Sequence, residues 1–108
     1  MEELENLRLL PFRLLDKTVQ IKIVKEYIKY RLGNTLGDTI TLSGRNFNRK
    51  FGLLDNGNDF QAFNKALTLL LLQVYTRNEL KARKKFIKFK GTGTTKYILE
   101  RKKLEQLF

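Results

Sequence analysis

Residues 81–103 read KARKKFIKFKGTGTTKYILERKK and contain ten lysines or arginines but one acid, Glu100. Two short runs that favour β-structure, 86–89 and 97–99, flank the turn-forming sequence GTGTT at 91–95. This pattern predicts a β-hairpin with a strongly basic surface. Such a surface suits contact with phosphate groups, although lysines also occur on ordinary hairpins because they keep exposed sheet edges from pairing with other chains.

The whole chain is basic, with 22 lysines and arginines against 11 acids and a net charge of +11. Residues 1–54 hold ten basic and six acidic residues, whereas residues 55–108 hold twelve and five. This excess favours a polyanionic partner such as DNA, RNA or an acidic membrane surface, and it places the strongest positive field near the hairpin. A length of 108 residues favours one domain with a single core.

Cysteine and histidine are both absent from the chain. Their absence excludes disulfides and catalysis by thiol or imidazole groups, and it removes the usual ligands of zinc, so we expect no metal and no cofactor. The apolar run at 69–72 is too short to cross a bilayer, and the acidic start at 2–5 opposes a secretory signal. We therefore expect a soluble, cytoplasmic protein with no membrane partner.

Apolar spacing and helix-breaking residues predict the elements of the first half. A short helix is expected over 1–10, a second from its N-cap Asp16 to about Leu32, and a brief strand over 38–42. Ser43 is expected to cap the next helix, which points Phe47 and Phe51 into the core.

A turn at 55–59 is expected to lead into a long helix that is capped by Asn58 or Asp59 and ends near Thr76. The segment 76–83 is then expected to be a polar turn before the hairpin. Phe86 is expected to make a satellite contact with the core rather than to stack on a base. The buried stripe expected on the long helix consists of Phe60, Phe63, Leu67, Leu70, Leu71 and Val74.

This order of helix, short strand, helix, turn, helix and basic hairpin resembles the winged helix-turn-helix domain over residues 16–101. The sequence TLSGRNFNRKFGL at 41–53 resembles the second helix of that family, and TTKYILE at 94–100 resembles its returning wing strand. Small size, basic charge and lack of cysteine are similar to winged-helix proteins of archaea and their viruses. The turn at 52–58 departs from the family because it is longer than usual.

The resemblance implies an α+β fold with a three-helix core, a short strand and a C-terminal hairpin wing. It divides the chain into an N-terminal arm (1–15), a winged-helix domain (16–103) and a C-terminal tail (104–108). Apolar residues in the arm and the tail suggest a homodimer formed through these two segments, since dimerisation lengthens the site of a small DNA-binding domain.

The same resemblance implies binding of double-stranded DNA, as a transcriptional regulator or an accessory DNA-binding factor, with the third helix in the major groove. Gln61 and Asn64 become base readers, since amides pair bidentately with adenine, and the preceding helix holds phosphate. The competing interpretation of each residue is a solvated helix face. The candidate DNA-binding residues are Arg45, Asn46, Arg49, Lys50, Gln61, Asn64, Lys65, Thr68, Lys84, Lys88, Lys90, Thr92, Lys96 and Arg101.

Two other functions are open to this sequence. Winged helices also serve as protein-interaction or assembly modules, because a fold does not fix a function. Asp59, Glu79 and Lys81 match the D…E-x-K pattern of many metal-dependent nucleases. In those enzymes the second acid and the lysine lie on one strand, whereas Glu79 and Lys81 are expected in a polar turn after a long helix. We therefore expect a binding protein and not an enzyme.

Overall fold

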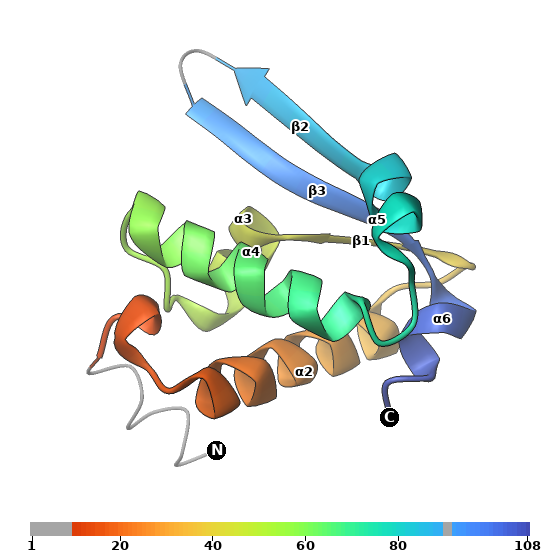
Figure 1. Cartoon of the computed structure of the whole chain (residues 1–108), viewed down its shortest axis with the longest axis horizontal. Helices are drawn as coiled ribbons and strands as arrows, with labels where there is room; N and C mark the ends of the chain where they lie inside the picture. Colours follow the sequence, from red (N-terminus) through yellow and green to blue (C-terminus); the bar gives the residue numbers. More distant parts are fainter. Residues whose placement is uncertain (1–9, 90–91) are drawn as a thin grey trace.

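The structure is a computed structural model that describes residues 10–89 and 92–108 (Figure 1). It has an α+β fold. In chain order, its elements are the 3-10 helix η1 (Phe12–Leu14), α2 (Lys17–Asn34), β1 (Thr39–Ser43), α3 (Gly44–Phe51), α4 (Gly57–Leu71), α5 (Arg77–Arg83), β2 (Lys84–Phe89), β3 (Thr92–Glu100) and α6 (Arg101–Glu105). The helix expected over 1–10 falls almost entirely outside the described residues.

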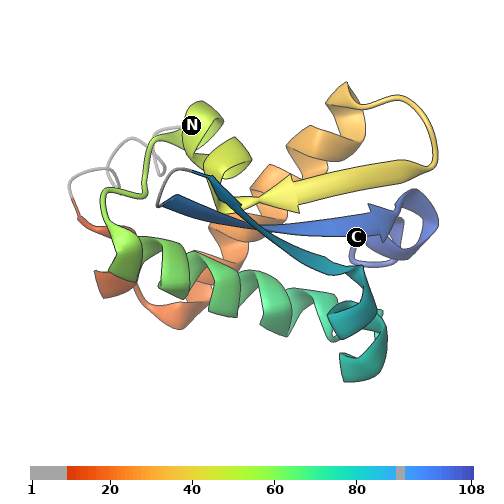
Figure 2. The ribbon, with the colours of Figure 1, turned by 90° about the horizontal axis from the view of Figure 1, so that it is seen from above.

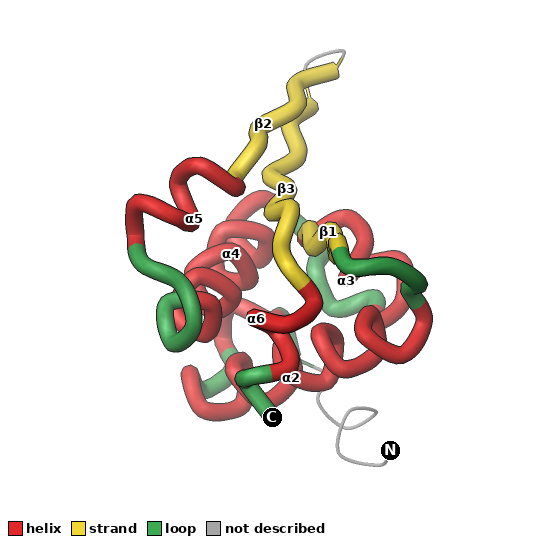
Figure 3. Tube along the Cα trace, turned by 90° about the vertical axis from the view of Figure 1, so that its right-hand side faces the viewer, coloured by secondary structure: helices red, strands yellow, loops and turns green. Residues whose placement is uncertain are grey.

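The three strands form one antiparallel sheet in the order β1-β3-β2. β1 pairs with residues 96–100 of β3, whereas β2 pairs with residues 92–97. The outer half of the β2–β3 hairpin therefore extends past the end of β1, and Figure 3 shows it projecting away from the helices. The hairpin predicted from the sequence is confirmed.

Helices α2 and α4 lie on one side of the sheet, as the view from above shows (Figure 2). Alternate residues of β1 and β3 point to that side, so Ile40, Leu42 and Leu99 have no exposure to solvent. Phe47 of α3 lies among four other rings at the centre of the core. Of the stripe expected on α4, four residues are buried and Phe60 and Val74 are partly buried.

The single core draws on all three parts into which the sequence was divided. Phe12 and Leu15 precede α2 and are buried, as are Leu104 and Leu107 at the C-terminal end. The arm and the tail therefore close the core of their own chain. Leu14 is 64% exposed. A homodimer contact through the arm would therefore have to use exposed apolar residues such as Leu14, because Phe12 and Leu15 are already buried within their own chain.

Side-chain caps begin three of the described helices, α3, α4 and α5. Ser43 Oγ accepts a hydrogen bond of 3.0 Å from the amide of Asn46 and starts α3, as expected. Asp16 occupies the N-cap of α2, but its side chain makes no capping bond. The cap expected for α4 is wrong, because Asn56 accepts from the amides of Asn58 and Asp59.

Asp59 lies in the first turn of α4 with a completely buried side chain. Its carboxylate accepts hydrogen bonds from the backbone amides of Arg13 and Asp55, at 3.1 and 3.0 Å, and from the Arg13 guanidinium at 3.1 Å. Burial raises the pKa of Asp59, but these bonds outweigh it and hold the pKa below its usual value. The carboxylate thereby joins the start of α4 to the arm.

The segment 76–83 is a helix, so the expectation of a polar turn there is wrong. Helix α4 ends at Leu71, and Thr76 then begins α5 through a capping box with Glu79, with bonds of 2.9 and 3.1 Å. Leu80 is buried under α5, and Arg83 at its end pairs with Glu100 of β3. Buried Leu80 and the pair of Arg83 with Glu100 therefore attach α5 to the body.

Among the described residues, no helix is both long enough and apolar enough to cross a membrane.

Candidate nucleic-acid interface

The two expected base readers lie in a groove between α4 and the hairpin, which we name the inner groove. It encloses about 550 Å³ and is lined by Arg45, Phe60, Gln61, Asn64, Phe86 and Gly93, among others. The groove joins the N-terminal half of α4, the start of α3 and the face of the hairpin that continues the core side of the sheet. Gln61 is exposed and Asn64 half-buried.

Lysines alternate with one aromatic ring on the groove side of β2. Phe86 lines the inner groove, so Lys84 and Lys88 share its face, while Lys85 and Ile87 point to the opposite side. Lys84 and Lys88 are both exposed. Neither strand of the hairpin carries an acid before Glu100. The hairpin thus presents positive charge toward the side on which Gln61 lies, and no salt bridge to Lys84 or Lys88 forms within 10–89 and 92–108.

Phe86 is 65% exposed, so its assignment as a satellite core contact is wrong. Its ring lies against Gly93 on the neighbouring strand, where a Cβ atom would come within 2.2 Å of Phe86 Cζ. The inner groove separates this ring from α4, so α4 does not bury it. Glycine at position 93 lets the ring rest on the backbone of β3.

Two other α4 candidates lie outside the inner groove. Lys65 is exposed and lines a hollow on the side of α2, together with Arg13 and Gln20. The Thr68 hydroxyl shares a hydrogen bond of 3.1 Å with the Tyr97 hydroxyl, so Thr68 packs against the sheet. The residues of α4 that face the groove are therefore those of its first two turns.

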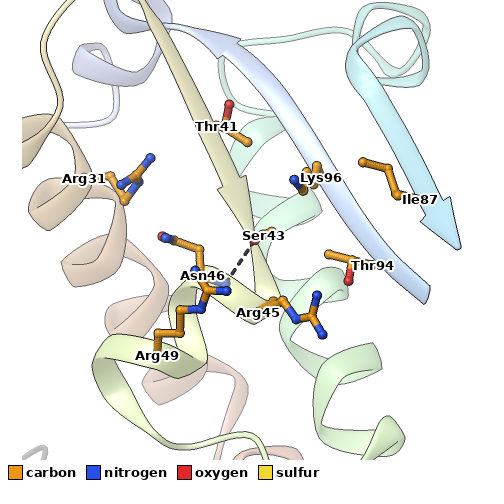
Figure 4. Close-up of a pocket in the computed structure, with 9 residues that line it drawn as sticks. All are labelled: Arg31, Thr41, Ser43, Arg45, Asn46, Arg49, Ile87, Thr94 and Lys96. Carbon is orange, nitrogen blue, oxygen red and sulfur yellow. Dashed lines mark hydrogen bonds between the residues drawn. The ribbon is translucent and has the colours of Figure 1, made fainter. Parts of the chain in front are cut away.

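The α3 candidates gather mainly on the other side of the sheet. Arg45, Asn46 and Arg49 line a second hollow there together with Lys96 (Figure 4). Arg45 and Thr94 also line the inner groove, so the two hollows meet at these two residues. Lys50 lies apart, with its Nζ 4.9 Å from the centre of the Tyr30 ring.

Asn46 has a structural partner in Tyr27. The Tyr27 hydroxyl donates to Asn46 Oδ1 at 2.8 Å and accepts from the amide of Ser43 at 3.2 Å. Burial raises the pKa of Tyr27 to about 12, so the phenol stays protonated near neutral pH and can serve as this donor. Tyr27 therefore fixes the junction of β1 and α3 from which Arg45 and Arg49 extend.

Arg101 serves the fold and does not join either group of candidates. Its guanidinium donates to the carbonyls of Leu32 and Gly37, at 3.0 and 2.7 Å, and to that of Thr35. These bonds tie the start of α6 to the connection between α2 and β1. Lys90 and the side chain of Thr92 lie outside the described parts of the chain.

Sequence reasoning missed three basic residues that the fold brings to these surfaces. Arg77 and Lys81 of α5 line a shallow hollow with Lys84, and Arg31 of α2 joins the second hollow. The sequence signal for α5 was the capping-box pattern at 76–79. A helix that begins there places residues 77 and 81 on the same side. No local signal in the sequence connects Arg31 with β3.

The acids of the proposed nuclease pattern have separate structural roles. Asp59 pairs with Arg13 in the core, and Glu79 caps α5, where the hydrogen bond from the Thr76 amide lowers the pKa of Glu79. Lys81 is an exposed residue of α5. Across 10–89 and 92–108, no cluster of three or more carboxylates gathers that would hold a metal ion.

Comparisons with known proteins give no relative for this chain: no family model matches it, and no curated protein or solved structure matches it either. Fold geometry and charge distribution are therefore the grounds for a functional proposal.

Proposed function

We propose that this protein binds double-stranded DNA through the inner groove, as a winged helix-turn-helix protein that acts as a transcriptional regulator or an accessory DNA-binding factor. The supporting observation is the basic hairpin, which projects from the body beside the polar first turns of α4. In this proposal α4 enters the major groove, where Gln61 and Asn64 meet base edges. Lys84 and Lys88 contact the phosphate backbone.

The topology supports the winged-helix part of this proposal. Helices α2, α3 and α4 correspond to the three helices of that domain, and β3 lies between β1 and β2 as the returning wing strand. Helix α5 is an addition between the third helix and the wing. Exposed lysines on a projecting hairpin also suit a duplex, because each neutralised phosphate releases condensed counterions and so favours binding.

Fluorescence anisotropy of labelled random duplex and single-stranded DNA would test the proposal, with salt raised from about 50 to 200 mM. We expect tight duplex binding that weakens steeply with salt, and weaker binding of single strands. Absence of binding even at the lowest salt would overturn the proposal and favour a protein-assembly module with a basic surface. Stronger binding of single strands than of duplex would remove the assigned role of α4.

Lys88→Ala is expected to weaken binding to all duplex sequences alike and to lower the salt slope by about one, since one phosphate contact is lost. The measurement is the same anisotropy titration, repeated at several salt concentrations. Lys102→Ala is the matched control, because Lys102 is equally a solvent-exposed lysine but lies on α6, away from the hairpin (Figure 1). Equal effects of both variants would show that overall charge, and not the hairpin, determines affinity.

Asn64→Ala is expected to reduce discrimination between a preferred site and its base-substituted variants by about 1 to 3 kcal/mol, while non-specific affinity changes little. The preferred site would first be selected from a random duplex library. Gln73→Ala removes an exposed amide beyond the end of α4 and serves as the control. Unchanged discrimination in the Asn64 variant would mean that the first turns of α4 do not read bases.

A further inference from the structure

The second hollow, which we name the outer pocket, lies on the face of the sheet opposite the inner groove. It encloses about 240 Å³, and Thr41 and Thr94 line it from β1 and β3. Both residues alternate along their strands with side chains that face the core, which places the pocket on the outer side. Arg31 of α2 and Arg49 of α3 reach it around the β1 edge (Figure 4).

Four cations from three separate elements line the outer pocket: Arg31, Arg45, Arg49 and Lys96. Among the described residues, no carboxylate lines it. Within the described residues, none of the four forms a salt bridge. Like charges brought together repel one another, so this arrangement lacks the counter-charge that would stabilise it.

Two further observations favour anion binding at this pocket. Arg31 Nε is buried and has no hydrogen-bond partner within the described part of the chain, although a buried donor normally has one. Lys96 also stands directly opposite Lys85 in the β2–β3 register, where a like-charge pair is destabilising. A bound anion would accept a hydrogen bond from Arg31 Nε, and its negative charge would offset the repulsion between Lys85 and Lys96.

The floor of the outer pocket is held in place before any ligand arrives. Tyr27 joins Ser43 and Asn46 through its hydroxyl, and Ser43 Oγ accepts from the Asn46 amide, shown as the dashed line in Figure 4. Because Asn46 Oδ1 is occupied by Tyr27, the amide nitrogen of its side chain remains as a donor. A fixed floor lowers the entropic cost of binding.

We propose that the outer pocket binds a phosphate group. Guanidinium groups donate paired hydrogen bonds that match phosphate oxygens, and three of them line this pocket along with one ammonium group. The hydroxyls of Thr41 and Thr94 supply neutral donors at its wall. This site goes beyond the proposed DNA interface, because it lies on the other face of the sheet. The phosphate belongs either to a small phosphorylated ligand or to a nucleic-acid backbone.

Titration of the 108-residue chain with inorganic phosphate and pyrophosphate, followed by ¹H–¹⁵N NMR, tests the site. We expect saturable shifts of the Arg31 Nε–H signal and of the Thr41 and Asn46 amides, which sodium chloride at equal ionic strength does not cause. The double variant Arg31→Gln/Arg49→Gln should weaken phosphate binding by about tenfold or more, since charge-assisted hydrogen bonds are lost.

The control removes the same charge elsewhere, in Lys65→Gln/Lys102→Gln, whose side chains are exposed and do not line the pocket. Equal weakening in both double variants, or shifts that do not saturate, would overturn the site. The amide spectrum of each variant establishes whether it is folded. If Arg31→Gln/Arg49→Gln unfolds the protein, Lys96→Gln replaces it, with a loss of phosphate binding again expected.

A short duplex distinguishes the two sources of the phosphate. If duplex DNA causes the same Arg31 shift and binds less tightly to the pocket variant, the phosphate belongs to a nucleic-acid backbone. If phosphate binds and DNA affinity is unaffected, the ligand is a small phosphorylated molecule. Lys88→Ala should change DNA binding without changing phosphate binding, so failure of the outer pocket and failure of the inner groove are separable.

Discussion

Replacement of Phe47 by alanine is expected to lower the free energy of unfolding by about 3 to 5 kcal/mol, because it removes a buried ring and leaves a cavity. Phe47 has no exposure to solvent. The centre of its ring lies 4.5 Å from that of Phe63, 4.9 Å from that of Phe51 and 5.3 Å from that of Tyr27. Since a domain of this kind is stable by about 5 to 15 kcal/mol, the variant loses a large part of its margin.

Urea denaturation followed by circular dichroism measures this loss as a lower midpoint with an unchanged slope. Phe86→Ala is the matched control, because it deletes the same atoms at a position that is 65% exposed. We expect that variant to lose less than about 1 kcal/mol. Similar losses in the two variants would contradict the placement of Phe47 in the core and of Phe86 on the surface.

Asp59→Asn is expected to lower the free energy of unfolding by about 2 to 3 kcal/mol at neutral pH. An asparagine amide cannot accept from the Arg13 and Asp55 backbone amides and the Arg13 guanidinium together, so buried donors lose their partner. The Arg13 side chain is 35% exposed, so water can take over part of its solvation. The loss is therefore smaller than for a pair buried on both sides.

The effect of Asp59→Asn should depend on pH in a defined direction. Because the folded-state pKa of Asp59 is lowered, the stability it contributes is present above the unfolded-state pKa of about 3.9 and is lost as pH falls through the folded-state pKa. Urea midpoints of wild type and variant, measured from pH 7 to pH 3, should therefore begin to converge as the pH falls below about 4. Asp38→Asn, at an exposed carboxylate, should follow wild type throughout. A wild-type advantage that stays constant down to pH 3 would contradict this account.

Elements with local signals could be predicted from the sequence. The hairpin follows from its β-favouring runs and glycine turn, and α3 follows from Ser43 and the spacing of Phe47 and Phe51. The end of α4 was missed because apolar residues continue past Leu71 at Leu72 and Val74, with only Gln73 between them. Leu72 and Val74 do remain partly buried, but they lie beyond the last turn of α4.

Contacts between distant residues could not be predicted. Arg13 and Asp59 are 46 positions apart, and nothing in the local sequence at 55–59 distinguishes a buried ion pair from a helix cap. The outer pocket likewise combines residues of α2, α3 and β3, which only the tertiary fold brings together. For the same reason the sequence assigned Arg45, Arg49 and Lys96 to one DNA surface with Asn64, whereas the fold separates most of them.

Helix α5 connects α4 to the hairpin and is tied to β3 on both sides. Tyr75, which precedes its N-cap, accepts a hydrogen bond of 2.9 Å from the Glu100 amide, and Arg83 at its end pairs with the Glu100 side chain. These contacts constrain the separation between α4 and the hairpin, which form the two sides of the inner groove. Under the proposed function, a bound duplex would have to fit this separation, so the bending stiffness of the DNA itself would become a criterion for selecting a site.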